Sequence, residues 1–499
     1  MTNVLLITVD QWRADCLSVA GHPVVRTPNL DRLAADGIRF TRHFAQTAPC
    51  GPSRASLLTG TYLHNHRSVG NGTPLDARFT NVALEFRGAG YDPVLFGYTD
   101  TTVDPRTVTD PDDPRLSTYE GVMDGFRPVV HLPEHARPWA ARLRARGLDL
   151  GDGYPEVFAQ QDLPEAAGRG STWAPARYPA ELSEAAFLTE AVIDHVAGST
   201  GEPWFVHLTY LQPHAPFVAP APYHDLYSPD DVPPPVRHPD ADSEGAVHPF
   251  IAAVLMSGLA NAPRTELEQR QWQATYYGMM SEVDAQIGRL VDALTRSGTI
   301  EDTIIVLTSD HGEQLGDHWL REKLAFFDSS YHIPLIFRLP DGVGAGTTVD
   351  RFTENVDIMP TLLDLCGLEP PVQCDGHSLR PFLEGATPLT WRDAAHWEWD
   401  FRDPTSDALE RSAGLTMDEC ALAVLRDEHG KYVHFGGFPP IFYDLETDPG
   451  ELHDVAADPL YRERVLNYAQ RLLTWRLTTD DRTLTGYLAT PDGMVHRRD

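Results

Sequence analysis

The run VLLITV at residues 4–9, followed at once by Asp10 and Gln11, is the stretch that decides the fold of this chain. Six consecutive residues without a charge predict a strand that is buried on both faces. Such strands occur in parallel sheets that are covered by helices on both sides. Polar residues directly after the strand lie at its carboxyl end, where open α/β sheets collect their active groups. The run therefore predicts an α/β sheet with a functional edge near Asp10.

The chain beyond this strand alternates between helical and strand patterns. Thr27 and Pro28 open a helix as N-cap and first residue, and a second helix is expected from about Pro52 to Gly60. The other expected elements are the helices 82–87, 182–196 and 271–294 and the strands 94–96, 204–210 and 303–308. This alternation favours a large α/β sheet with helices on both faces.

Two stretches rich in Pro and Gly, 104–179 and 213–249, interrupt this pattern. Long irregular insertions in compact enzymes are usually access loops or subunit contacts. The composition changes again near 370–376, and the chain then shows short strands such as 431–435, a helix over 460–475 and a polar tail. We predict a catalytic α/β domain over 1–375 and a C-terminal α+β subdomain over 376–499, with a tail used in oligomerisation.

The charge balance limits the possible partners. The 499 residues include 40 Lys and Arg against 72 Asp and Glu, a formal net charge of −32. Nucleic acids and anionic membranes bind basic faces, so we expect neither as a partner. No stretch reaches the ~20 apolar residues of a membrane span. The first apolar run is too short for a signal peptide and ends in an acid, so we expect a cytoplasmic protein.

The cysteines are odd in number, and no two show Cys-x-x-Cys spacing; they are Cys16, Cys50, Cys366, Cys374 and Cys420. A disulfide framework or a structural zinc site is therefore not expected. Cys50 differs from the others because it lies just ahead of an expected helix. The dipole and the free N–H groups at a helix N-terminus stabilise negative charge on a nucleophile.

Cys50 also begins the run CGPSRASLLTG at 50–60, the pattern Cys-x-Pro-x-Arg followed by Leu-Thr-Gly. This run resembles the signature of the sulfatases, in which the cysteine is oxidised after translation to an aldehyde, formylglycine. Nearly the whole chain is similar to the sulfatase branch of the alkaline phosphatase superfamily, with further support at 27–31, 356–361 and 443–451. Within that branch it looks most like the phosphonate monoester hydrolases, at 10–15, 50–52, 97–99, 310–318 and 481–485.

The resemblance implies both a fold and a chemistry. The fold is alkaline-phosphatase-like: a large mixed sheet between helices, with a smaller C-terminal domain of a short antiparallel sheet and a helix. In the chemistry, the hydrated aldehyde carries two hydroxyls on one carbon. One hydroxyl attacks sulfur or phosphorus, and the other then loses its proton, so that the hemiacetal collapses and the anion is expelled. A serine has no second hydroxyl and would need an attack by water instead.

The resemblance also implies one divalent metal, held by Asp10, Gln11, Asp310 and His311 with an oxygen of modified Cys50. The usual sulfatase set has more carboxylates and an asparagine, and it suits Ca²⁺. Imidazole suits transition metals better than Ca²⁺. We therefore expect Mn²⁺, with Ca²⁺, Zn²⁺ or Fe²⁺ as alternatives. His311 could instead orient Asp310 from outside the metal shell.

By the same resemblance, three more side chains act in catalysis. Arg54 lies one helical turn after Cys50 and would hold the aldehyde hydrate. Lys323 would grip the substrate oxygens, although a lysine is more commonly a solvated surface residue. His214 stands between prolines and would protonate the leaving group, unless it is only a rigid loop residue.

Asn71 and Tyr98 match positions that contact the transferred group in phosphonate monoester hydrolases, although Tyr98 could also be a core aromatic. Two residues after the tyrosine those hydrolases carry a threonine, whereas this chain has Asp100. A carboxylate beside an anionic substrate is unfavourable unless it faces a cation or is protonated. Asp100 could favour a substrate with a basic group, shift the preference between sulfate and phosphonate, or point away.

Taken together, these residues predict a formylglycine-dependent hydrolase of sulfate monoesters that also cleaves phosphonate monoesters and phosphate diesters. In the alternative hypothesis, phosphonate monoesters and phosphate diesters are the primary substrates and sulfate monoesters are secondary ones. Two other hypotheses keep Cys50 as a thiol: a slow phosphodiesterase, or a metal-binding scaffold without catalysis. As partners we expect a small-molecule substrate, a formylglycine-generating enzyme during maturation, and further copies of the chain in a dimer or tetramer.

Overall fold

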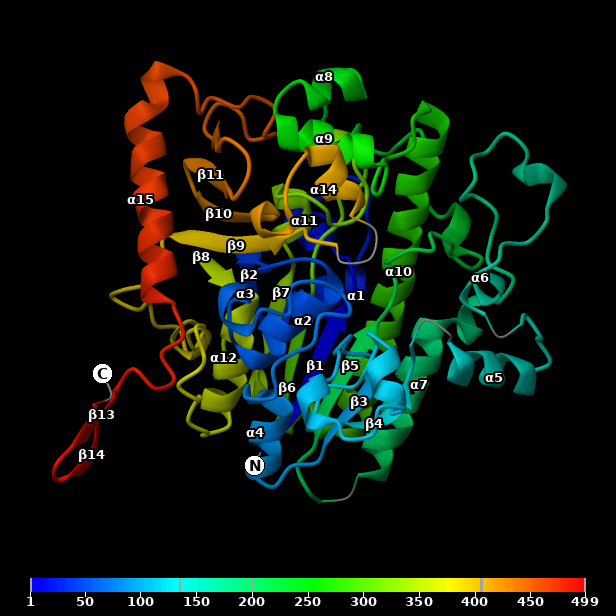
Figure 1. Ribbon diagram of the computed structural model, residues 1–499. Helices are drawn as coiled ribbons and strands as arrows, with labels where there is room; N and C mark the ends of the chain where they lie inside the picture. Colours follow the sequence, from blue (N-terminus) through cyan, green and yellow to red (C-terminus); the bar gives the residue numbers. More distant parts are fainter. Residues whose placement is uncertain (1, 134–135, 152, 200, 404–406, 498–499) are drawn as a thin grey trace.

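A sheet of eight strands forms the centre of the molecule (Figure 1). The computed structural model describes residues 2–133, 136–151, 153–199, 201–403 and 407–497. The strand order is β4-β3-β5-β1-β6-β7-β2-β8, and β7 is antiparallel to both neighbours while the other pairs are parallel. The strands are β1 (Asn3–Val9), β2 (Ile38–Phe44), β3 (Pro93–Gly97), β4 (Arg127–His131), β5 (Phe205–Tyr210), β6 (Thr303–Ser309), β7 (Leu335–Arg338) and β8 (Thr347–Glu354). The prediction of a large mixed sheet is confirmed.

Helices cover both faces of this sheet. The helices that pack on its two faces include α1 (Pro28–Ala35), α2 (Cys50–Thr59), α4 (Val82–Gly88), α7 (Glu184–Gly198), α10 (Glu266–Ser297) and α12 (Ile358–Leu365). Because side chains alternate along a strand, Leu5 and Ile7 of β1 pack in one cluster with residues of α1, α7 and α10. Val4 and Leu6 pack in another cluster with residues of α2, α4 and α12. The run at 4–9 is thus buried on both sides, as predicted.

Some local predictions were wrong. Helix α2 begins at Cys50 with Pro49 as its N-cap, so Cys50 lies in the first turn and not ahead of the helix. Pro52 is tolerated there because the first-turn N–H groups have no partner within the helix. Thr27 is the N-cap of α1, but its hydroxyl hydrogen-bonds to Ser18 and does not cap the helix. The strands β2, β7 and β8 were missed, since β2 and β8 mix charged and apolar residues.

The irregular stretches contain short elements. The stretch 104–179 forms β4 and two helices, and Trp139 of α5 is fully buried. Other α-helices in the described part of the chain are α3 (Leu63–His66), α5 (Arg137–Ala145), α6 (Tyr154–Val157), α8 (Ala241–Gly245), α9 (Pro249–Ser257), α11 (Asp328–Tyr331), α13 (Arg380–Leu383) and α14 (Ala408–Ala413). Within the described residues, no helix has both the length and the apolar content that crossing a membrane requires.

The C-terminal part contains a second, antiparallel sheet, as predicted. Its order is β12-β11-β10-β9, with β9 (Ala394–Asp400), β10 (Ala421–Asp427), β11 (Gly430–Phe435) and β12 (Ile441–Asp444). Helix α15 (Arg462–Thr478) packs Leu472 and Trp475 against this sheet. The tail is not simply polar: it forms the hairpin β13 (Tyr487–Thr490) and β14 (Gly493–His496), which projects from the body in Figure 1. The domain boundary at 375 stays a prediction.

Helix α10 buries an acidic side chain in the core. Glu282 is fully buried, and in the described part of the chain no donor meets either carboxylate oxygen in good hydrogen-bond geometry, although the Ser183 hydroxyl lies nearby. Burial raises the pKa of Glu282 to about 8, although the nearby Ser183 hydroxyl lowers it in part. Glu282 is therefore protonated at neutral pH, because an unpaired buried carboxylate is costly.

This burial predicts a pH-dependent stability. Between pH 4.5 and 8 the unfolded chain releases the Glu282 proton while the folded protein keeps it, so the stability from this group is present below that window and lost as pH rises through it. In Glu282→Gln, the free energy of unfolding relative to the wild type should increase by about 3–4 kcal/mol between pH 5 and pH 8. Denaturant unfolding at both pH values measures this. As a control, Glu463→Gln, at an exposed site on α15, should show the same pH dependence of the free energy of unfolding as the wild type. If Glu282→Gln also shows the wild-type pH dependence, Glu282 is not held protonated in the folded protein.

Candidate active site

The sheet brings the predicted polar residues to one edge. Strand β1 pairs with β6 so that Val9 lies opposite Ser309, and with β5 so that Val9 lies opposite Tyr210. Both pairs are parallel, so Asp10 and Asp310 leave the sheet side by side. His214 follows β5 on the same edge. The structure thus places these residues together beyond the strand ends, where open α/β sheets collect active groups, and their roles in catalysis stay predictions.

Helix α2 presents Cys50 to this edge. The Ser53 hydroxyl donates to the backbone carbonyl of Asp310, which fixes the first turn of the helix to the end of β6. The Gly51 N–H donates to Asn71 Oδ1 at 2.9 Å. A Cβ on Gly51 would lie 2.9 Å from the Asp100 carbonyl oxygen, so only glycine allows this close approach.

Four potential metal ligands converge beside this helix. One donor atom from each of Asp10, Cys50, Asp310 and His311 lies within 4.8 Å of the others, and all four residues are buried. His311 Nε2 lies 3.2 Å from Cys50 Sγ, 3.6 Å from Asp10 Oδ1 and 3.9 Å from Asp310 Oδ1. His311 Nδ1 donates to the Gly312 carbonyl at 3.0 Å, which leaves the Nε2 lone pair directed at the cluster. Two carboxylates and an imidazole suit a divalent transition metal.

Arg54 holds the two carboxylates in place. Its guanidinium donates from Nε to Asp310 Oδ2 at 3.0 Å and from Nη2 to Asp10 Oδ2 at 3.1 Å. The Tyr98 hydroxyl donates to the same Asp10 oxygen at 2.6 Å, and the guanidinium lies over the Tyr98 ring at 4.3 Å from its centroid. Within the described part of the chain, the hydrogen bonds and ion pairs of Arg54 are therefore with the carboxylates and Tyr98, not with Cys50.

Gln11 and Lys323 lie next to the cluster. Gln11 has a positive φ of 67°, a backbone conformation that is rare outside glycine. Its Nε2 donates to Glu313, and its Oε1 accepts from Lys323 Nζ at 3.2 Å. The role of Gln11 as a metal ligand stays a prediction. Lys323 is 6 % exposed, so it is not the solvated surface lysine that the sequence allowed.

Lys323 also contacts His214. Its Nζ lies 2.8 Å from His214 Nε2, while His214 Nδ1 lies 2.8 Å from the Ala215 carbonyl oxygen. With Nδ1 as the donor to that carbonyl, Nε2 is the atom that exchanges a proton in the site. Burial lowers the pKa of Lys323, but the surrounding acidic groups, among them the carboxylates of Glu322, Asp10 and Asp310, outweigh it and raise the pKa overall. The lysine therefore stays charged.

The carboxyl and thiol groups respond differently to the same surroundings. Burial raises the pKa of Asp10, but the positive charges of His214, His311, Arg54 and Lys323 outweigh burial and hold that pKa below its usual range. Burial and the negative charge of Asp10 raise the pKa of the Cys50 thiol well above its ordinary value. An unmodified Cys50 is thus protonated, and a thiol is a weaker nucleophile than a thiolate.

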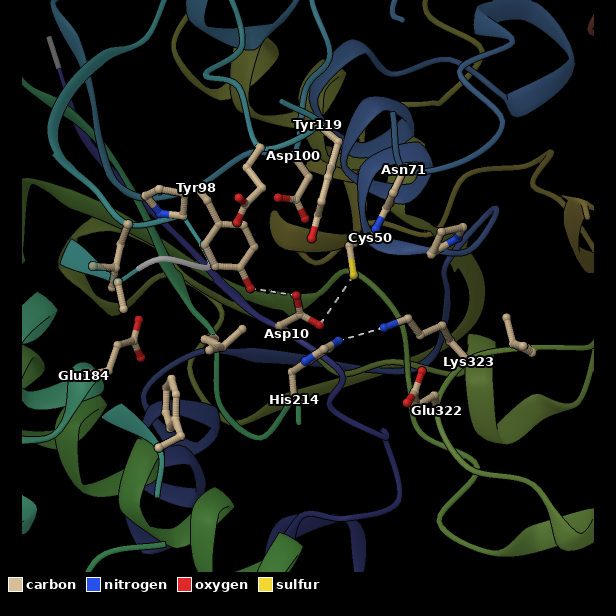
Figure 2. A pocket seen from close by; sticks show the side chains of 18 residues that line it. Asp10, Cys50, Asn71, Tyr98, Asp100, Tyr119, Glu184, His214, Glu322 and Lys323 are labelled. Carbon is tan, nitrogen blue, oxygen red and sulfur yellow. Dashed lines mark hydrogen bonds between the residues drawn. The ribbon is translucent and has the colours of Figure 1, made fainter. Parts of the chain in front are cut away.

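A cavity of about 360 Å³ opens onto these groups (Figure 2). The predicted residues that line it are Asp10, Cys50, Asn71, Tyr98, Asp100, His214 and Lys323. Gln11, Arg54, Asp310 and His311 are not among its lining residues. Asp100 does not point away: burial, with Asp10 and Asp310, raises its pKa to about 8 against the opposing effect of Arg54, which lies 4.0 Å away. Asp100 thus faces a cation, and its raised pKa favours the protonated form. These are the two conditions under which a carboxylate is tolerated beside an anionic substrate.

Sequence reasoning missed several lining residues, namely Tyr119, Glu120, Phe158, Glu184 and Glu322. Tyr119 and Glu120 come from the irregular stretch 104–179, which gave no periodic signal. Glu184 follows Ser183 at the start of α7, where an acid is the ordinary partner of a helix N-terminus. No local pattern distinguishes it from a structural acid.

Arg54 should stabilise the fold as well as the site. In Arg54→Met two buried carboxylates lose their shared cation, so we expect the free energy of unfolding to fall by about 3–5 kcal/mol. Denaturant unfolding of metal-free protein measures the change. Arg32→Met removes a half-exposed pair with Asp292 at 2.9 Å and should cost at most about 1 kcal/mol. Equal losses in the two variants would contradict the role of Arg54.

Comparisons with known proteins agree with this geometry. The sulfatase family model matches residues 2–368, and a model of the C-terminal region of N-sulphoglucosamine sulphohydrolase matches 316–478. The multifunctional alkaline phosphatase superfamily protein PehA of Trinickia caryophylli is 43 % identical over 99 % of each chain. The phosphonate monoester hydrolase of Agrobacterium radiobacter has a TM-score of 0.94 at 47 % identity over 100 % of both chains. That of Silicibacter pomeroyi has 0.95 at 40 % identity, over 100 % of this chain and 99 % of its own. The chain therefore belongs to the sulfatase family of the alkaline phosphatase superfamily, as a hydrolase related to the phosphonate monoester hydrolases.

Proposed function

We propose that this protein is a formylglycine-dependent hydrolase of phosphonate monoesters, phosphate diesters and sulfate monoesters in one site. The observation that carries the proposal is the convergence of Asp10, Cys50, Asp310 and His311 at the first turn of α2, where Asp10 and Cys50 line a cavity. A thiol with a raised pKa is poorly suited to attack there, which favours conversion of Cys50 over the two hypotheses that keep it as a thiol.

The conversion of Cys50 is a two-electron oxidation of its Cβ. The C–S bond breaks, sulfur leaves as sulfide, and a carbonyl oxygen takes its place. Molecular oxygen acts as the oxidant and accepts two further electrons from a thiol reductant, which yields one water. The side chain is 5 % exposed in the fold, so we propose that a formylglycine-generating enzyme acts on the chain before α2 is buried.

After hydration, the aldehyde supplies the nucleophile. One hydroxyl passes its proton through a neighbouring carboxylate to water as it attacks phosphorus or sulfur and displaces the leaving alcohol. The alcohol takes a proton from protonated His214 Nε2, and His214 regains a proton from water before the next turnover. The second hydroxyl then loses its proton through the neighbouring carboxylates to water. The carbonyl re-forms, the bond to the transferred group breaks, and the anion leaves. A new water hydrates the aldehyde, so the net reaction consumes one water for each ester.

The other residues of the site position the substrate and neutralise its charge. Lys323 Nζ faces the cavity beside His214 and would bind the oxygens of the transferred group. Asn71 accepts from Gly51, which leaves its amide nitrogen to donate to the same oxygens. Arg54 and Tyr98 keep Asp10 fixed and ionised. Such preorganised donors stabilise the charge that develops in the transition state.

Asp10, Asp310, His311 and the modified Cys50 would hold one divalent metal, and Mn²⁺ fits this donor set better than Ca²⁺. Gln11 would join them if its amide turned away from Lys323. When bound, such an ion lowers the pKa of a hydroxyl and neutralises the oxygens of the transferred group.

The favoured substrates are esters with one negative charge. Among the residues that line the cavity, only Lys323 and His214 can supply positive charge. Two groups suit the single charge of a phosphonate monoester, a phosphate diester or a sulfate monoester, but not the two charges of a phosphate monoester. Similarity to the two phosphonate monoester hydrolases supports phosphonate and diester cleavage ahead of sulfate cleavage, the alternative order of the sequence analysis.

The test of this proposal combines mass spectrometry with kinetics. The peptide containing Cys50 should show oxygen in place of sulfur and two hydrogens. Protein of assayed metal content should cleave an aryl phosphonate monoester, an aryl phosphate diester and an aryl sulfate. Cys50→Ala should lower kcat/KM on all three by about 10³-fold or more. Cys50→Ser should release one equivalent of phenol and then stop, because its ester lacks the second hydroxyl.

Cys366→Ala is the matched control, since Cys366 lies outside the cavity and should behave as the wild type. An intact Cys50 thiol in fully active protein would refute the formylglycine mechanism. Full turnover by Cys50→Ala would refute the role of the residue altogether.

We also propose that the protein is a homo-oligomer held by its C-terminal hairpin. Tyr487, Leu488, Met494 and Val495 of β13 and β14 are all at least 44 % exposed. An isolated two-stranded hairpin is marginally stable in water, so it needs a surface to pack on. A second copy of the chain would supply that surface.

Deleting residues 484–499 should reduce the mass measured by light scattering after size-exclusion chromatography, from a dimer or tetramer to a smaller species. Leu488→Asp with Met494→Asp should act in the same direction. Leu389→Asp, at a fully exposed position elsewhere, should leave the mass unchanged. A wild-type mass in the truncated protein would exclude the hairpin as the contact.

A further inference from the structure

The active-site cavity contains more acid than binding an anion requires. Its lining includes Asp10, Asp100, Glu120, Glu184 and Glu322, against the possible cations Lys323 and His214. Carboxylates repel an anionic sulfate or phosphonate. Each lining acid therefore needs either a role in the site or a partner elsewhere.

Some of these acids have a cation nearby. Asp10 accepts from Arg54 at 3.1 Å, and Asp100 lies 4.0 Å from the same guanidinium. Glu322 lies 3.9 Å from the guanidinium of Arg321. These contacts account for three of the carboxylates without any group from the substrate.

Glu184 differs from them. It is 1 % exposed, and within the described residues no donor meets either carboxylate oxygen in good hydrogen-bond geometry and no ion pair is formed; the Leu211 backbone N–H lies near but does not satisfy it. A buried polar group without a partner is uncommon, because desolvation costs about 1–3 kcal/mol or more when no bond replaces water. Burial, together with Glu282, raises the pKa of Glu184 to about 8, although the Leu211 backbone lowers it in part. Without a ligand the side chain is therefore held as a neutral acid.

The position of Glu184 connects it with the leaving group. In Figure 2, Glu184 lies on the opposite side of His214 from Lys323. The cavity wall also includes the apolar side chains of Leu132, Phe158 and Leu211. If His214 protonates the leaving oxygen, the organic part of the leaving group extends from His214 along this apolar wall. A basic group at its far end would meet the Glu184 carboxylate.

Glu282 shows that burial alone does not make such a subsite. It is equally buried, and its oxygens equally lack partners, but it does not line the cavity. Glu282 is therefore a structural acid of the helical core. Glu184 differs from it in facing a space that a ligand can enter, so the two residues form a matched pair for experiment.

Resting on the function proposed above, we propose that Glu184 binds a protonated aliphatic amine carried by the leaving-group alcohol or phenol of the substrate. An alkylammonium has three N–H donors, enough to satisfy both unpartnered oxygens. Its carbon chain would pack on Phe158 and Leu211. A charge-assisted hydrogen bond of this kind is stronger than a neutral one. The enzyme should therefore cleave esters that carry the amine in preference to neutral esters, and not merely accept them.

The experiment compares two phosphonate monoesters that differ only at the end of the leaving group. One has a para-aminoethylphenol leaving group, and the other has para-propylphenol, in which a methyl replaces the ammonium. The readout is the ratio of kcat/KM for the amine ester to that for the propyl ester. In the wild type this ratio should exceed 10, and in Glu184→Gln it should fall by about 10- to 100-fold. Glu282→Gln should keep the wild-type ratio.

Each other outcome has a definite meaning. A wild-type ratio near one, or an unchanged ratio in Glu184→Gln, overturns the amine subsite while leaving the hydrolase function intact. A trimethylammonium analogue that is favoured as strongly as the amine also overturns it, because that group donates no N–H. Failure of the converted wild type to cleave either ester overturns the proposed function itself.

If Glu184→Gln does not fold, inhibition of the wild type provides the measurement. Phenethylamine should compete with the propyl ester at least 10 times more strongly than propylbenzene, its neutral counterpart. Equal inhibition by the two compounds would overturn the subsite.

Discussion

The register between β1 and β6 is the constraint on which the site depends. Because Val9 lies opposite Ser309, Asp10 and Asp310 emerge together, and Arg54 from α2 reaches both. A shift of one residue would turn every side chain of β1 to the other face of the sheet. The same register brings the backbone N–H of Gln11 to within 3.2 Å of Asp310 Oδ1. The packing of apolar β1 residues on both faces therefore fixes the catalytic groups as well as the core.

Local pairing explains how an acidic protein can bind an anion. The net charge of −32 belongs to the whole chain, and solvent and salt screen the part of it that is exposed. Inside the site, Lys323 stays charged and Asp10 stays ionised because each is surrounded by opposite charge, and low polarizability strengthens those interactions. Asp100 and Glu184 are instead held neutral by burial. The site thus separates ionised from protonated carboxylates over a short distance.

The sequence was informative where a candidate site residue comes directly after a strand. Asp10 and the pair Asp310-His311 come at the ends of continuous apolar runs, so their meeting at one sheet edge could be predicted. The position of Glu184 in the cavity could not be predicted, because it depends on how α7 packs against β5 and on the irregular stretch that supplies Phe158. The hairpin at 487–496 was missed for a similar reason: its strands are short, and none of the residues that the structure describes buries them.

The two ends of the cavity are under different physical demands. At the Cys50 end, several groups share a few hydrogen bonds and ion pairs, so a change in one disturbs the others. At the Glu184 end, a single carboxylate faces apolar walls and has no partner within the described chain. A change there alters few internal contacts but strongly alters which ligand is accommodated. Substrate preference within this architecture is therefore set more readily at the leaving-group end than at the end where bonds are broken.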